Sequence, residues 1–200
     1  MSTERRGGRT RSPEAHQAVL AAAAELLEEH GYQALTIEKI AARSGVAKST
    51  IYRWWRSRPE LVMEAYTQTV DRRMPEPDAG SVQSDLTVFV TELYRVVKHP
   101  LRVRTLRGLM AEAQLDEDFR EPFRAWVNSR RAIVAHLLER GIERGELDPG
   151  LDIGHATDLI FGPFWYRLLV EHEPLDPTDA AAHVTRLIRG LGRTQGSEVE

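Results

Sequence analysis

Residues 46–55, with the sequence VAKSTIYRWW, place two cations, three hydroxyl groups and two tryptophans in ten positions. Lysine, arginine and hydroxyl side chains bind phosphate oxygens, and the same groups donate hydrogen bonds to base edges in the major groove of DNA. The first 58 residues hold 10 Lys/Arg and 6 Asp/Glu, whereas the remainder holds 17 and 24. The basic part of the chain therefore carries this segment, which indicates an anionic partner.

A short helix over roughly Lys48 to Trp55 would sort these side chains onto two faces. Ile51 and Trp55 are four residues apart and share one face, so both can close a small hydrophobic core. Trp54 falls near the exposed side, where its ring could stack on the sugar-phosphate backbone. The polar side chains that face away from the core in this arrangement are Lys48, Ser49, Tyr52 and Arg53.

Two further helices are expected to precede and position this face. The first begins with Ser12 as N-cap and Pro13 at the first helical position, and it ends at Gly31. The second follows Thr36, whose side chain is placed to accept a backbone N–H bond, and it ends at Gly45. Two helices joined by a tight glycine turn predict a helix-turn-helix unit.

Residues 35–62, LTIEKIAARSGVAKSTIYRWWRSRPELV, resemble the signature of tetracycline-repressor-like (TetR) regulators, and the resemblance includes the helix before them. The residues that fit the signature are Thr36, Ile40, Ala41, Gly45, Val46, Lys48, Thr50, Tyr52, Arg58 and Leu61. The chain departs from the signature by conservative changes. Ser44 replaces an alanine, Ile51 replaces a leucine, Trp55 replaces a phenylalanine and Arg58 replaces a lysine.

The resemblance implies a homodimer whose two recognition helices enter successive major grooves of a pseudo-palindromic operator, with half-site centres about 34 to 36 Å apart. It also implies two sets of DNA contacts. The residues expected at phosphates are Thr36, Tyr52, Trp54 and Arg58. The residues expected to make base or mixed contacts are Lys48, Ser49, Thr50 and Arg53.

The N-terminal arm admits two interpretations. Its arginines could reach an adjacent minor groove, as basic arms of other DNA-binding domains do, or they could form a solvated tail. Both readings stay open for Arg5, Arg6, Arg9 and Arg11.

The rest of the chain has only helical periodicity, which predicts an all-α fold. The expected organisation is an N-terminal arm with a three-helix DNA-binding domain over residues 1–58, followed by a larger helical effector-binding and dimerisation domain over residues 59–200. A helix over 59–74 links the two and is expected to transmit a ligand signal. In the helix over 152–172, the Gly162–Pro163 pair should produce a kink or an interruption.

The last two helices are expected to form the dimer interface, because the first of them is apolar on nearly every side and the resembled family dimerises there. The interface residues expected are Leu168, Ala181, Val184, Leu187, Ile188 and Leu191. The family also implies an effector cavity among the middle helices, favouring an apolar or aromatic ligand. Its predicted lining is Phe89, Tyr94, Met110, Phe123, Trp126, Phe161, Phe164, Trp165 and Tyr166.

Composition and missing motifs argue against other classes of protein. Without cysteine the chain cannot form disulfides, and no apolar run reaches the roughly 18 residues of a membrane span, so a cytoplasmic protein with no membrane partner is expected. No metal, cofactor or catalytic motif is recognisable, so no enzyme activity is expected. The predicted function is a homodimeric repressor released from double-stranded operator DNA by a small-molecule effector. An architectural DNA-binding protein without an effector is the alternative.

Overall fold

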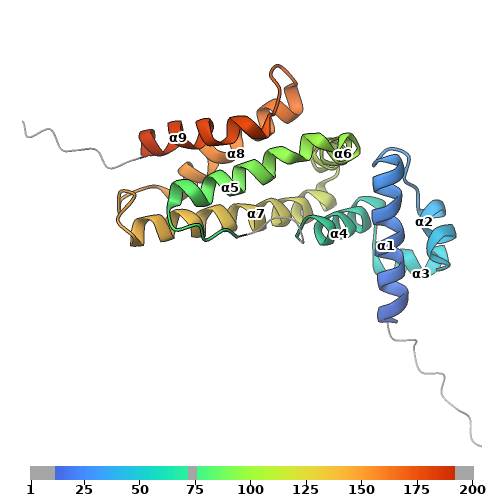
Figure 1. The fold of residues 1–200 in the computed structure, drawn as a ribbon. Coiled ribbons are helices and arrows are strands. Elements are labelled where there is room, and N and C mark those ends of the chain that lie inside the picture. Colours follow the sequence, from blue (N-terminus) through green and yellow to red (C-terminus); the bar gives the residue numbers. More distant parts are fainter. Residues whose placement is uncertain (1–11, 72–75, 192–200) are drawn as a thin grey trace, which may run out of the picture.

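The computed structural model describes residues 12–71 and 76–191, apart from the side chains of residues 70, 71 and 191 (Figure 1). The predicted arginine arm therefore lies outside the described residues. The regular elements of the described residues are all helical, which confirms the predicted all-α class. They are α1 (Pro13–His30), α2 (Ile37–Ser44), α3 (Lys48–Trp54), α4 (Arg58–Asp71), α5 (Val82–Tyr94), the 3-10 helix η1 (Arg95–Lys98), α6 (Pro100–Leu115), α7 (Glu117–Glu143), α8 (Ile153–Val170), the 3-10 helix η2 (Pro177–Asp179) and α9 (Ala180–Leu191).

The caps of the first two helices confirm the signals read from the sequence. The Ser12 side chain accepts a hydrogen bond from the Ala15 N–H, and the Thr36 side chain accepts one from the Lys39 N–H. Gly31 follows α1 with φ of 74°, and Gly45 follows α2 in the left-handed conformation with φ of 69°. Because side chains with a Cβ rarely adopt these angles, glycine fits both stops.

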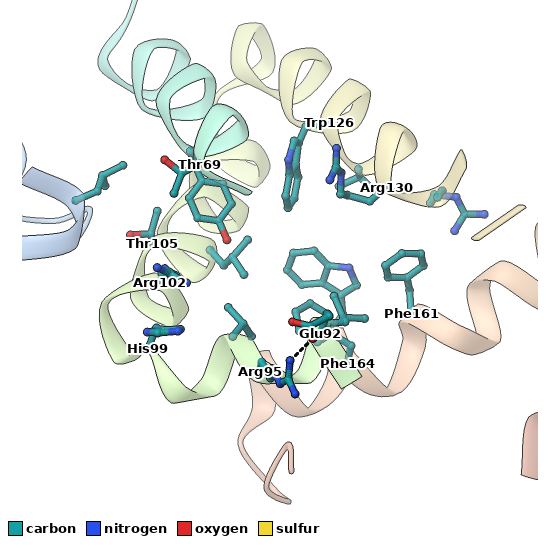
Figure 2. A pocket seen from close by; sticks show the side chains of 18 of the residues that line it. Thr69, Glu92, Arg95, His99, Arg102, Thr105, Trp126, Arg130, Phe161 and Phe164 are labelled. Atoms are coloured by element: carbon teal, nitrogen blue, oxygen red, sulfur yellow. Dashed lines mark hydrogen bonds and ion pairs between the residues drawn. The ribbon is translucent and has the colours of Figure 1, made fainter. Parts of the chain in front are cut away.

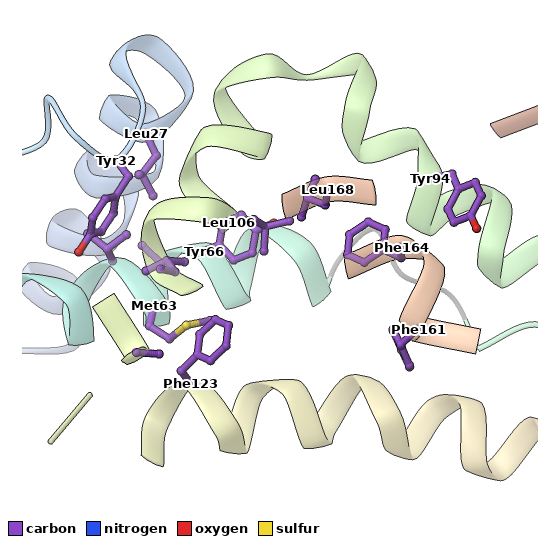
Figure 3. Close-up of a cluster of buried hydrophobic side chains, with 14 of the residues drawn as sticks. Leu27, Tyr32, Met63, Tyr66, Tyr94, Leu106, Phe123, Phe161, Phe164 and Leu168 are labelled. Carbon is purple, nitrogen blue, oxygen red and sulfur yellow. The ribbon is translucent and has the colours of Figure 1, made fainter. Parts of the chain in front are cut away.

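Helix α4 joins the N-terminal helices to the rest of the molecule. It packs against α1 on one side and against α6 and α7 on the other. The buried hydrophobic side chains form one cluster that runs from α1 through α4 and α6 to α8 and α9, and Figure 3 shows its members Tyr32, Tyr66, Leu106 and Phe164. The N-terminal helices and the larger end therefore share a core. The predicted boundary after residue 58 falls at the start of α4 and stays a prediction.

Helices α5 and α8 differ in continuity. Helix α5 ends at Tyr94 and is followed directly by the 3-10 helix η1, and α6 then begins at Pro100. Helix α8 continues through Pro163 without the interruption considered above. Pro163 has no N–H to donate to the carbonyl of Leu159, four residues earlier. In α9, the pKa of His183 is lowered, because burial disfavours the cation and Arg167 repels it.

A buried carboxylate fixes the start of α5. Asp85 has no exposed surface; it accepts a hydrogen bond from the Ala79 N–H at 2.5 Å and ion-pairs with Arg140 at 2.9 Å and Arg144 at 3.2 Å, both from α7. Burial alone would raise its pKa, but the Ala79 hydrogen bond and the two guanidinium groups hold the pKa below its usual range. Asp85 thus joins α5 to the end of α7.

Asp85→Asn is expected to lower the free energy of unfolding by about 1 to 3 kcal/mol, since it leaves two partly exposed arginines without their shared counter-ion. Because the pKa is lower in the folded than in the unfolded protein, the native contribution of Asp85 is present above pH about 4 and is lost as pH falls below it. Chemical denaturation at pH 7 and pH 3 measures both effects. Asp78→Asn, at an exposed carboxylate, is the control; equal losses in the two variants would contradict the assignment.

Candidate DNA interface and ligand cavity

Helix α3 presents one polar face to solvent and buries the other. Ile51 is fully buried, whereas Tyr52 is 53% exposed. Lys48, Ser49 and Arg53 are also exposed, and Thr50 is half-buried. The structure therefore brings together on one short helix six of the side chains predicted to contact DNA: Lys48, Ser49, Thr50, Tyr52, Arg53 and Trp54.

The two tryptophans after this face have different surroundings. Trp55 is buried; its indole N–H donates a 2.7 Å hydrogen bond to Glu64 of α4, and its ring stacks on His16 of α1 with centroids 4.7 Å apart. Trp54 is half-buried and packs edge-on against Trp55, with centroids 5.7 Å apart, and beside His16. The end of α3 is therefore fastened to both α1 and α4. The sequence pattern gave no sign of Glu64 or His16 in this role.

Three of the side chains predicted to contact DNA, those of Thr36, Lys48 and Arg58, already have partners within the protein. Thr36 caps α2, so its hydroxyl oxygen is already an acceptor. Lys48 forms an exposed ion pair with Glu38 at 3.1 Å. Arg58 is half-buried: its guanidinium donates to the Leu35 carbonyl at 3.2 Å and lies 4.6 Å from the centre of the Tyr32 ring. Arg58 thus has a structural role that the predicted phosphate contact did not include.

A cavity of about 660 Å³ opens between α1, α4, α5, α6, α7 and α8 (Figure 2). This volume falls within the range of small-molecule sites. Aromatic rings form part of the wall, from Tyr66, Trp126, Phe161, Phe164 and Trp165. Charged groups and a histidine form another part: Glu28, Glu92, Arg95, His99, Arg102, Arg130, Arg131 and Asp158.

Four of the nine side chains predicted for the effector pocket line this cavity, namely Trp126, Phe161, Phe164 and Trp165. The other five lie elsewhere, which corrects the prediction for this cavity. Phe89 is fully buried behind Phe161, and the hydroxyl of buried Tyr94 lies 2.7 Å from His183 Nδ1. Phe123 packs behind Trp126 and Trp165. Met110 is half-buried outside the cavity, and Tyr166 is 58% exposed.

The charged part of the wall was missed because only aromatic spacing was followed. Arg130 comes four residues after Trp126, and Asp158 comes three residues before Phe161, so helical periodicity places each beside an aromatic residue of the wall. Arg95, His99 and Arg102 were harder to predict, since the change from η1 to α6 lies between them.

Comparison with known proteins agrees with this architecture. Residues 19–65 match the family model of bacterial regulatory proteins of the tetR family, and residues 76–187 match that of the tetracyclin repressor-like C-terminal domain. The chain belongs to the TetR family. It is 36% identical to the uncharacterized HTH-type transcriptional regulator YdeS of Bacillus subtilis, over 96% of each chain. It is therefore a helix-turn-helix transcriptional regulator, as the resemblance of residues 35–62 indicated.

Solved TetR-family structures share the fold. The regulator SCO0332 superposes with a TM-score of 0.81 at 34% identity, covering 90% of this chain and 100% of that one. FadR of Bacillus subtilis, whose structure was determined in complex with stearoyl-CoA, superposes with a TM-score of 0.61 at 20% identity. This superposition covers 88% of this chain and 98% of FadR. No helix in residues 12–71 or 76–191 is both long and apolar enough to cross a membrane.

Helix α6 connects the cavity of this TetR-family chain to the DNA-binding end. Its residues Arg102 and Thr105 line the cavity, as does His99 just before the helix, and Arg102 ion-pairs with Glu28 of α1 at 3.3 Å. Farther along, Gly108 lies against the Tyr32 ring, so close that a Cβ at this glycine would be 2.5 Å from a ring carbon. The Tyr32 hydroxyl donates to Glu112 at 3.2 Å, and burial raises its pKa to about 12.

The residues predicted for the dimer interface divide into two groups. Leu168 and Val184 are buried inside the protomer, so their side chains cannot form its outer surface; this corrects the prediction for both. Ala181 is exposed, Leu187 and Ile188 are half-buried, and the Leu191 side chain lies outside the described residues. Four large apolar side chains on α8 are exposed instead: Leu159, Tyr166, Leu169 and Val170.

Trp55→Phe is expected to destabilise the protein by about 1 to 2 kcal/mol, because it removes the hydrogen bond that Glu64 accepts. Thermal or urea unfolding at neutral pH measures the change. Tyr52→Phe alters an exposed ring and should change stability by less than about 0.5 kcal/mol. A Trp55→Phe variant as stable as Tyr52→Phe would show that the indole N–H does not fasten α3 to α4.

Proposed function

We propose that this TetR-family regulator is a homodimeric repressor that binds a two-fold symmetric operator and is released by a ligand in the cavity. The observation that carries the proposal is the face of α3, on which Lys48, Ser49, Tyr52 and Arg53 are exposed while Ile51 is fully buried. Cations and hydroxyl groups on a solvent-facing helix suit phosphate oxygens and base edges in a major groove. Thr50 stands beside them, half-buried on the same helix.

Contacts to the DNA backbone would flank this face. Thr36 lies at the start of α2, and the Trp54 ring is half-exposed at the end of α3. The Arg58 guanidinium uses one nitrogen for the Leu35 carbonyl, so its other N–H groups could bind a phosphate. In this proposal Arg58 orders the turn before α2 and contacts DNA at the same time.

The proposed dimer uses the outer face of α8. The positions of Leu159, Tyr166 and Val170 differ by seven and four residues, which places them along one side of a helix, next to Leu169. Exposed apolar side chains gathered in this way mark an interaction surface. A two-fold axis would pair this face with its copy, and exposed Ala181 of α9 would allow close approach.

Ligand release requires that cavity and α3 respond together. Helix α4 contributes Tyr66 and Thr69 to the cavity and Glu64 to the Trp55 contact. Helix α6 contributes Arg102 to the cavity and Gly108 to the Tyr32 contact. A ligand that favours a different position of either helix would shift the protein away from the DNA-binding arrangement. An architectural DNA-binding protein would need no such cavity.

Selection of bound duplexes from a random pool with the full-length protein should yield one two-fold symmetric motif. On that operator, Lys48→Ala is expected to weaken binding about tenfold or more, by removal of a base or phosphate contact. Tyr52→Phe should weaken it less and lower the salt dependence little, because only a neutral hydroxyl is lost. Fluorescence anisotropy at several salt concentrations measures both.

Arg124→Ala, at an exposed arginine of α7, is the charge-matched control and should leave operator affinity unchanged. Binding without an enriched motif would favour the architectural alternative. Equal losses in Lys48→Ala and Arg124→Ala would contradict recognition by α3.

Leu169→Glu is expected to convert the dimer into a monomer, because it would bury a carboxylate at the proposed α8 interface without a partner. Sedimentation velocity of the wild type and the variant measures the change. Leu115→Glu is the control, because it introduces the same charge in place of an apolar side chain that is 85% exposed at the end of α6. A Leu169→Glu variant that remains dimeric would exclude this face of α8.

A further inference from the structure

The cavity wall contains groups of both charges. Among the residues that the structure describes, four arginines and three carboxylates line the cavity, together with His99. Each carboxylate already has an arginine partner: Glu92 pairs with Arg95, Glu28 with Arg102 and Asp158 with Arg131. A cationic ligand would therefore have to take a carboxylate away from an arginine, whereas an anionic ligand would offer a further partner to the arginines of the wall.

Arg102 lies across the cavity from part of the aromatic wall. Figure 2 shows His99 and Arg102 at one side of the cavity and Trp126 and Phe161 at the other. A ligand that fills this space would place an apolar body against the rings and direct a polar group toward Arg102. Arginine suits a carboxylate or phosphate there, because its planar N–H groups can donate two parallel hydrogen bonds.

We propose that the cavity binds an amphipathic anion, whose aromatic or apolar body packs against the rings and whose carboxylate or phosphate binds Arg102 in competition with Glu28. This inference rests on the proposed function, since it names the class of the releasing ligand. Arg102 and Glu28 are the α6 and α1 ends of an ion pair at the cavity wall. A head group that takes Arg102 would open this connection between the ligand-binding and DNA-binding parts.

The two groups are suited to such an exchange. The Glu28 side chain is 52% exposed, so water can solvate it when Arg102 leaves, and the contact of 3.3 Å is longer than a strong charged hydrogen bond. Arg102 is only 22% exposed, so it stays at the cavity wall when its partner changes. Arg102 would then act as the specificity-determining residue for the head group.

Calorimetric titration of the full-length protein without DNA tests the ligand class directly. The probes share a naphthyl body and differ in head group: 2-naphthylacetate, 2-naphthyl phosphate, 2-(2-naphthyl)ethanol and 2-(2-naphthyl)ethylammonium. At least one of the two anions should bind about tenfold or more tightly than the alcohol, with the ammonium weakest. The better anion distinguishes a carboxylate site from a phosphate site. An alcohol or ammonium that binds as tightly as both anions, or no binding by any probe at millimolar concentration, would overturn the proposal.

Two variants test the assignment to Arg102. Arg102→Gln should lose about tenfold in affinity for the preferred anion and keep its affinity for the alcohol, which also reports that the cavity is intact. Arg104→Gln removes an exposed arginine of the same helix outside the cavity, and it should bind both probes as the wild type does. Equal losses in the two variants would show a long-range charge effect and overturn a contact with Arg102.

Glu28→Gln tests the competition. This variant should bind the preferred anion several-fold more tightly than the wild type, because Arg102 no longer has a carboxylate partner; unchanged affinity would overturn the exchange. Operator affinity, measured separately with and without the anion, tests the proposed function. An anion that binds through Arg102 without releasing DNA would support the proposed ligand class but would contradict ligand-controlled repression.

Discussion

The seven-residue helix α3 cannot hold its own conformation, and the N-terminal helices around it are organised by this constraint. Isolated helices of this length are unstable in water, so packing must fix α3. Ile51 and Trp55 supply that packing, and the Trp55 indole bonds to Glu64 of α4. A movement of α4 would therefore change the position of the exposed face of α3. The two tryptophans have different roles. Trp55 stacks on His16 and anchors the helix, and Trp54 packs beside the same histidine.

Helices α4 and α6 connect the cavity to the N-terminal helices. α4 and α6 each touch both the cavity and the DNA-binding end, through Tyr66 and Glu64 in one case and through Arg102 and Gly108 in the other. The interior is close-packed, as the contact of Gly108 with the Tyr32 ring shows. A shift of α6 would therefore also move the groups packed against it. Together with the single hydrophobic cluster from α1 to α9, these contacts give a continuous physical connection between cavity and α3.

The sequence predicted the helices well and the cavity only in part, and the difference has a physical reason. Caps, glycine stops and helical periodicity are local signals, so Ser12, Thr36 and Gly45 were placed correctly. The wall of the cavity depends on which faces of distant helices meet. Phe89 and Phe161 both have core-like spacing, yet only Phe161 reaches the cavity. Likewise, periodicity alone does not separate the inner face of α8, with Leu168, from its outer face.

We propose that the cavity and α3 form one coupled system, and the absence of cysteine allows a direct test. A Gln33→Cys variant, at an exposed position between α1 and α2, would accept one spin label per protomer. Double electron–electron resonance then measures the distance between the two DNA-binding ends. The account predicts one narrow distribution with operator bound, and a shifted distribution when 2-naphthylacetate saturates the cavity of the free dimer. A distribution at saturation that is identical to the operator-bound one would contradict it.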